Sequence, residues 1–171
     1  GADGKLRYKF KKEDIKRISK ELGDIDPVVI EETALGESEL ISIEQLEKVY
    51  FVLISCHMAK DNYAEASQYA SILKHSDNKY YSYFGIYVET LSSKYLLSNT
   101  EDIKTNYAKA IAYFKNRILA DYTDSLATLF RVRLYAEIGE YERAKELSSI
   151  LSENDKIAAL NYIQECQQKQ W

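Results

Sequence analysis

The side chains that could carry acid–base, nucleophilic or metal chemistry are few and scattered in this sequence. One histidine, His57, lies within an apolar helical pattern, and the other, His75, lies in a polar stretch. The two cysteines, Cys56 and Cys166, are far apart and form no CxxC pair, so neither a disulfide framework nor a zinc site is indicated. A single histidine on an apolar face is more often a packing residue than a catalyst.

The acidic residues and the known short motifs give no catalytic constellation either. The sequence contains no HExxH, phosphate-binding loop, GxSxG or GxGxxG pattern. The acidic residues Glu31, Glu32, Glu37 and Glu39 lack a partnered acid or base, which is typical of a solvated surface. An active pocket needs several convergent polar groups. We therefore predict no catalytic residue, no bound metal and no cofactor, and we do not expect the chain to be an enzyme.

Length and composition favour one helical domain. The 171 residues suit a single domain, and a content of 46% apolar residues can bury a core. Sandwiches and barrels with many tight turns normally need more glycine and proline than the six Gly and the single Pro27 found here. We therefore predict the all-α class.

Charge and hydropathy narrow the range of partners. The net charge is −4, which disfavours nucleic acid, because a nucleic-acid-binding protein is expected to show a basic patch. One basic run, between Lys5 and Lys20, could favour an anionic surface, but such runs are more often solvated termini. No apolar run of 18 residues occurs, so we expect no transmembrane segment in this chain.

A short polar turn, followed by a tyrosine and then by an alanine three residues later, recurs along the chain. It occurs at Tyr63–Ala66, Tyr107–Ala110 and Tyr141–Ala144. The last two copies are 34 residues apart, and the first two are 44 apart. A helical unit that recurs with a period near this length indicates stacked helical hairpins.

Helical spacing and turn residues divide the chain further. We expect a flexible basic segment at residues 1–12 and a single helical domain at 13–171, which begins with short helices at Glu13–Leu22 and Val28–Leu35. Three hairpins are predicted at about 42–75, 80–119 and 124–151, followed by a capping helix at 155–168. Ser42, with Gln45 three residues later, is the predicted N-cap of the first hairpin.

The capping helix and the middle hairpin each carry a further prediction. In the capping helix, Ile157, Leu160 and Ile163, with Ala159, form the predicted inward face, and the opposite side is polar because the end of a stack faces water. The middle hairpin, Tyr80–Leu119, is about ten residues longer than its neighbours and rich in tyrosine. We expect its tyrosines to serve mainly in packing, and we expect any function beyond stacking to lie in this hairpin.

Three groups of residues carry a family signature. They are Tyr81, Phe84, Gly85 and Val88; Ala110 and Phe114; and Gly139, Tyr141 and Ala144. With these groups, residues 42–151 resemble the tetratricopeptide repeat family. The resemblance implies a right-handed α–α superhelix of about three hairpins, with an N-terminal extension and a C-terminal capping helix. It also implies that Gly85 lies where the two helices of one hairpin approach closely.

The resemblance implies a binding function. In such stacks the first helices of the hairpins line a concave groove that binds extended peptides or helices. The inward-facing positions of the family map onto Lys48, Phe51, Ser55, Met58, Ser82, Ile86, Glu89, Leu129 and Arg133. Because this set mixes apolar and charged side chains, we expect a protein or peptide partner of mixed polarity.

A second hypothesis is a structural or sensor role in a larger exported bacterial assembly or lipoprotein. Such a role would act through oligomerisation, for which a cap-to-cap homodimer is one form. The first residues, Gly1–Gly4, are small and flexible and would suit a tether after a cleaved signal or a lipid-bearing cysteine. We accordingly expect a periplasmic or membrane-tethered location ahead of a cytoplasmic one.

Overall fold

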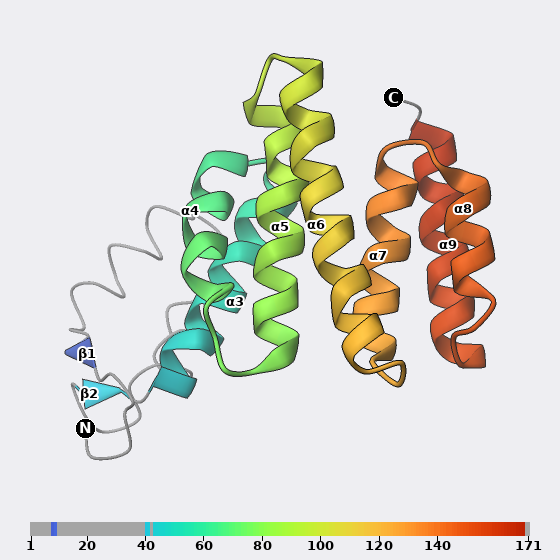
Figure 1. The fold of residues 1–171 in the computed structure, drawn as a ribbon. Coiled ribbons are helices and arrows are strands. Elements are labelled where there is room, and N and C mark those ends of the chain that lie inside the picture. The colour runs from blue at the N-terminus through green and yellow to red at the C-terminus, as the bar shows by residue number, and fades with distance from the viewer. Residues whose placement is uncertain (1–7, 10–39, 42, 170–171) are drawn as a thin grey trace.

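The computed structural model describes residues 8–9, 40–41 and 43–169 (Figure 1). Strands β1 (Tyr8–Lys9) and β2 (Leu40–Ile41) pair antiparallel. The helices are α3 (Ile43–Ala59), α4 (Tyr63–Leu73), α5 (Lys79–Leu96), α6 (Thr100–Ala120), α7 (Ser125–Glu137), α8 (Tyr141–Ser148) and α9 (Glu153–Lys169). The helices predicted at 13–22 and 28–35, the Ser42 cap and most of segment 1–12 lie outside the described residues.

The all-α class predicted from the sequence is confirmed. α3 with α4 and α7 with α8 lie within two of the predicted hairpin ranges, α5 with α6 extends one residue beyond each end of the third, and α9 follows them. Among the helices that the structure describes, none combines the length and the apolar character that crossing a bilayer would require.

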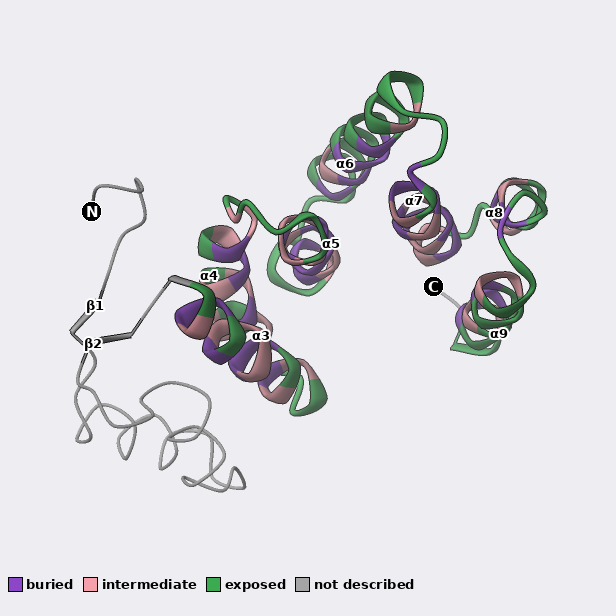
Figure 2. Ribbon diagram, turned by 90° about the horizontal axis from the view of Figure 1, so that it is seen from below, coloured by how far each residue is buried: buried purple, intermediate pink, exposed green. Residues whose placement is uncertain are grey.

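The helices form a curved row in which successive helices alternate between two sides (Figure 2). α3, α5, α7 and α9 lie on the inner side of the curve, and α4, α6 and α8 lie on its outer side. α5 packs against α4, α6 and α7, and α7 packs against α6, α8 and α9. We call the side formed by α3, α5, α7 and α9 the inner face.

Local sequence signals explain where the helices begin and end. Asn78, Asn99 and Asp124 each accept a hydrogen bond from a backbone N–H in the first turn of α5, α6 and α7, respectively. Such caps satisfy donors that a helix leaves unpaired, and each typically contributes about 0.5–2 kcal/mol. Gly139, between α7 and α8, has φ +82, a left-handed conformation that glycine adopts without a steric penalty.

Large aromatic side chains fill the space between α5, α6 and α7. Tyr83, Phe114 and Phe130 are almost completely buried. The Tyr83 ring meets the Phe114 ring edge to face at 5.2 Å, and the Phe114 and Phe130 rings stack at 5.8 Å. The Tyr83 hydroxyl donates a hydrogen bond to the capping carboxylate of Asp124. The start of α7 is therefore attached to the N-terminal part of α5.

Gly85 lies where α4 and α5 approach most closely. A Cβ atom at this position would lie 2.6 Å from the Lys74 backbone nitrogen and 2.8 Å from the Ala70 carbonyl oxygen. The close approach is thus made to α4 of the preceding hairpin. This differs from the expectation that Gly85 would meet its own hairpin partner, α6.

The predicted inward face of α9 is partly wrong. Ile157 and Leu160 are 55% and 38% exposed, whereas Ala159, Ile163 and Cys166 are buried. The physical reason lies in the polar groups of the helix. Cys166 lies on the same side of α9 as Tyr162 and bonds to α7, so this side turns inward and leaves Ile157 and Leu160 in solvent.

Candidate functional site

A row of aromatic side chains joins the four helices of the inner face. Its members are Phe51 from α3, Tyr80, Phe84 and Tyr87 from α5, Phe130 from α7 and Tyr162 from α9, and we call this set the aromatic row. The Phe51 and Phe84 ring centroids are 4.9 Å apart, and the Tyr87 and Phe130 centroids are 5.3 Å apart. Tyr80 is 44% exposed, and Phe51, Phe84 and Tyr162 are half-buried. The row therefore offers ring surface to solvent as well as to the core.

Arg133 lies among three members of the aromatic row. Its guanidinium carbon is 5.9 Å from the Tyr87 ring centroid, 5.6 Å from that of Phe130 and 5.4 Å from that of Tyr162. These distances suit cation–π attraction. The Arg133 Nε atom is buried without a hydrogen-bond partner, and the side chain forms no ion pair in the described part of the chain. The rings hold the cation in place, and no carboxylate of the described residues lies within ion-pair distance of it.

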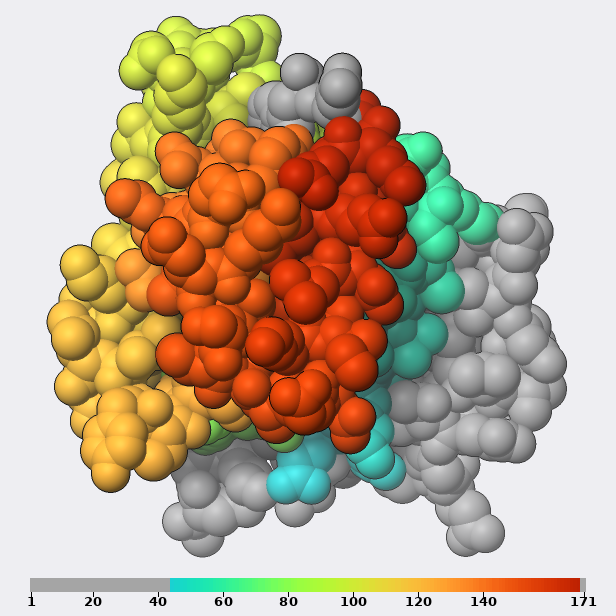
Figure 3. All heavy atoms as spheres, turned by 90° about the vertical axis from the view of Figure 1, so that its right-hand side faces the viewer, coloured from blue at the N-terminus to red at the C-terminus, as the bar shows by residue number. Residues whose placement is uncertain are grey.

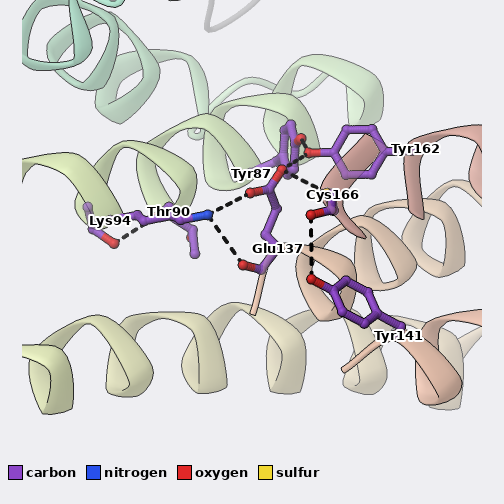
Figure 4. Close-up of polar contacts among 8 residues, drawn as sticks. Tyr87, Thr90, Lys94, Glu137, Tyr141, Tyr162 and Cys166 are labelled. Atoms are coloured by element: carbon purple, nitrogen blue, oxygen red, sulfur yellow. Dashed lines mark hydrogen bonds and ion pairs between the residues drawn. The ribbon is translucent and has the colours of Figure 1, made fainter. Parts of the chain in front are cut away.

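A polar network, centred on Glu137 at the end of α7, links α5, α7 and α9 (Figure 4). Its carboxylate accepts hydrogen bonds from Lys94 Nζ at 3.1 Å, from the Tyr162 hydroxyl and from Cys166 Sγ at 3.5 Å. The Tyr87 and Tyr162 hydroxyls are also hydrogen-bonded to each other. The Lys94 and Glu137 side chains are only 14% and 13% exposed. We call these five residues the Glu137 network.

Burial and charge set the protonation of the network. Burial, the nearby Tyr87 and the Glu137 charge raise the pKa of Tyr162 far above its ordinary value of 10.0. Burial, with the Glu137 charge beside it, raises the pKa of the Cys166 thiol to about 12. Because the thiolate is the nucleophilic form of cysteine, the protonated Cys166 acts at neutral pH as a hydrogen-bond donor. The network thus fixes the relative positions of three helices.

The structure does not bring all of the predicted groove residues together. Phe51 belongs to the aromatic row and Arg133 lies within it, and Met58 and Leu129 pack half-buried against the core. Lys48 and Ser55 are exposed on α3.

Three further predicted groove residues, all on α5, lie on the side of the helix that meets α4. The Ser82 hydroxyl donates a hydrogen bond to the Lys74 carbonyl oxygen. Glu89 forms an ion pair with Lys74 at 3.0 Å, and Ile86 lines the same outer cleft.

Sequence reasoning missed Tyr80, Tyr87, Tyr162 and the Glu137 network. On α5 the positions 80, 84 and 87 recur with the same helical spacing as 82, 86 and 89, so periodicity alone does not distinguish the two sides. The available signal was the density of tyrosines, which was interpreted as packing. The ion pair between Lys94 and Glu137 spans 43 residues and has no local sequence pattern.

The remaining candidate groups serve packing. His57 is 2% exposed, and its ring stacks on Tyr69 with centroids 5.9 Å apart. Its Nδ1 atom lies 3.3 Å from the side-chain nitrogen of Asn62, in the turn before α4. Among the described residues, no group of three or more His, Cys, Asp or Glu side chains is placed to hold a metal ion.

Comparisons of the chain with protein-family models, with curated proteins and with solved structures found no match. A functional interpretation therefore depends on the residues of the inner face and on their arrangement.

Proposed function

We propose that the chain is a non-enzymatic protein-interaction module, with a tetratricopeptide-like superhelical arrangement. Its inner face would bind an extended segment of another protein. One observation carries the proposal: the rings of Tyr87, Phe130 and the half-buried Tyr162 surround an arginine that forms no ion pair in the described chain, and the same row exposes other rings to solvent. Aromatic residues and arginine are the side chains most enriched at the energetic centres of protein interfaces.

The chemistry of this face defines the segment that would fit. Phe51, Phe84 and Tyr80 provide apolar ring surface for aliphatic or aromatic side chains. Arg133 provides a planar set of donors, which matches a carboxylate. The expected partner is therefore a peptide with apolar residues and at least one Asp or Glu.

Random-peptide display on the folded chain tests the proposal. We expect the enriched peptides to combine apolar residues with an acidic one, and to bind a Phe51→Ala/Arg133→Ala double variant at least about tenfold more weakly. The matched control is Lys115→Ala/Leu119→Ala on α6, where both side chains are exposed. Melting curves would show that both variants are folded. Equal affinity of the double variant and wild type would contradict the proposal.

The alternative role, assembly through oligomerisation within an exported bacterial structure, is favoured by a different surface. α8 and α9 form the end of the row (Figure 3). Ile157 and Leu160 are exposed on α9, and Ile150, which precedes it, is 70% exposed. Multi-angle light scattering of wild type and of Ile157→Asp/Leu160→Asp tests this role. A dimer that becomes a monomer in the variant supports it, and a monomeric wild type argues against it.

A further inference from the structure

An open cleft lies on the outer side of the row, between α4, α5 and α6. Its volume is about 440 Å³, within the range of ~300–1,000 Å³ that is common for small-molecule sites. The lining residues on α5 and its C-cap run from Ile86 to Leu97, which corresponds to about 16 Å along a helix axis. The cleft is therefore elongated, and it lies on the side of α5 away from the aromatic row.

Short side chains create this cleft. α4 and α6 both pack on α5, and between them the lining residues include Ser67, Thr90, Ser93 and Ala110. None of these side chains is long enough to fill the space between two helices. Gly85 contributes indirectly, because it holds α4 close to α5 and so fixes one wall.

The walls of the cleft differ in polarity. Leu96, Leu97 and Tyr113 line it and are 48%, 39% and 38% exposed, respectively. Exposed apolar side chains that lie together, as Leu96 and Leu97 do, commonly mark binding surfaces. Leu96 and Leu97 form an apolar end of the cleft, and Tyr113, whose ring contacts Tyr83, lies toward the other end.

The positive charge of the cleft lies on α6. Lys74 is already paired with Glu89 at 3.0 Å. Lys109 lines the cleft and forms no ion pair in the described part of the chain. The half-buried Asn106 also lines the cleft, and its side chain makes no hydrogen bond to any described residue. Because residues three apart on a helix are neighbours on its surface, Asn106 and Lys109 present an amide and an ammonium group side by side.

We propose that the outer cleft binds a small, elongated organic acid, which is a molecule with an apolar chain and one terminal carboxylate. The chain lies against Leu96 and Leu97. The carboxylate accepts hydrogen bonds from Lys109 Nζ and from the Asn106 amide. This site is separate from the inner face, so it does not depend on the proposed peptide-binding function.

Titration calorimetry with decanoate and with decan-1-ol tests the assignment, because the two probes share the apolar chain and differ in charge. We expect wild type to bind decanoate at least about tenfold more tightly than the alcohol. Lys109→Gln should reduce this preference to near one by weakening decanoate alone. The matched control, Lys115→Gln, removes an exposed lysine of α6 that does not line the cleft and should bind like wild type.

A second variant locates the site. Asn106→Trp places a large side chain in the cleft and should abolish decanoate binding, while the melting temperature shows that the chain is folded. Amide NMR shifts on adding decanoate should be confined to α4, α5 and α6. The assignment is overturned if wild type does not bind decanoate, if Lys109→Gln binds it with unchanged affinity, or if the shifts map to the inner face.

Discussion

The two places where α5 meets the neighbouring hairpins are built by opposite means. The α4–α5 junction depends on a missing side chain, because Gly85 lets backbone atoms of Ala70 and Lys74 approach closely. The junction of α5 with α7 and α9 depends on large side chains instead. There, Phe130 packs among aromatic rings, and the Glu137 network connects the three helices.

The difference determines what fixes the spacing of the helices at each junction. The close backbone contact at Gly85 fixes the distance between α4 and α5, because any atom added at Gly85 would clash with the backbone of α4 and its C-cap. At the second junction, the fit of rings and hydrogen-bonded pairs fixes the geometry. Substitutions should therefore act on the two junctions in different ways: an added atom harms the first, and a removed atom or charge harms the second.

The largest effect is expected from Phe130→Ala, at the second junction. Phe130 is 1% exposed and contacts the rings of Tyr83, Tyr87 and Phe114. Truncating a buried phenylalanine typically lowers the free energy of unfolding by about 3–5 kcal/mol, because a cavity remains. Urea denaturation measures the change. Tyr122→Ala, at a position that is 89% exposed, is the control and should change stability by less than about 0.5 kcal/mol.

The second-largest effect is expected from Glu137→Gln, which should lower the free energy of unfolding by about 2–3 kcal/mol. The substitution keeps the shape but leaves the largely buried Lys94 ammonium without its anion. If this explanation is correct, Lys94→Met in the Glu137→Gln background should restore part of the lost stability. A double-mutant cycle in urea checks this. Additive losses in the two single variants and the double variant would show that the ion pair does not contribute as proposed.

Gly85→Ala tests the first junction. Alanine is more favourable than glycine within a helix by about 1 kcal/mol, so the same substitution at an exposed helical position would stabilise the protein. At Gly85 the new Cβ would lie 2.6 Å from the Lys74 backbone nitrogen, and α4 must move away. We expect the free energy of unfolding to fall by about 1–2 kcal/mol. Relative to wild type, amide exchange should become faster in α4 and change less in α9. Unchanged exchange in α4 would contradict the close packing of this junction.

The parts of the structure that the sequence predicted are those that local chemistry determines. Gly139 lies at a turn between two helices because a left-handed turn favours glycine. Which side of α5 faces inward depends on distant helices, and α5 carries apolar residues all round, including Tyr83, Phe84 and Ile86. Its orientation could not be read from periodicity.

The missed part of the candidate site has a similar cause. Glu137 is a charged residue at the end of a helix, a position usually solvated. Its side chain is only 13% exposed here because Lys94 and Tyr162, from two other helices, supply its hydrogen bonds. Such pairing becomes visible only when the helices are placed in space.

The smallest effect at neutral pH is expected from Tyr107→Phe, beside the second junction. The Tyr107 hydroxyl is buried without a hydrogen-bond partner among the described residues. Removing an unpartnered buried hydroxyl relieves a desolvation cost, so the variant should be as stable as wild type at pH 7 or more stable by up to about 1 kcal/mol. A loss above 1 kcal/mol would indicate that the hydroxyl is bonded.

At high pH the same variant should differ more from wild type. Burial, with the Glu137 charge, raises the pKa of Tyr107 well above its ordinary value of 10.0. Above pH 10 the unfolded chain loses this proton and the folded chain keeps it, so the free energy of unfolding falls as pH rises above 10. Each tyrosine that stays protonated only in the folded chain lowers the free energy of unfolding by up to about 1.4 kcal/mol for every further pH unit. Urea denaturation between pH 9 and 11 should therefore show a shallower decline for Tyr107→Phe than for wild type, with Tyr122→Phe as the exposed control.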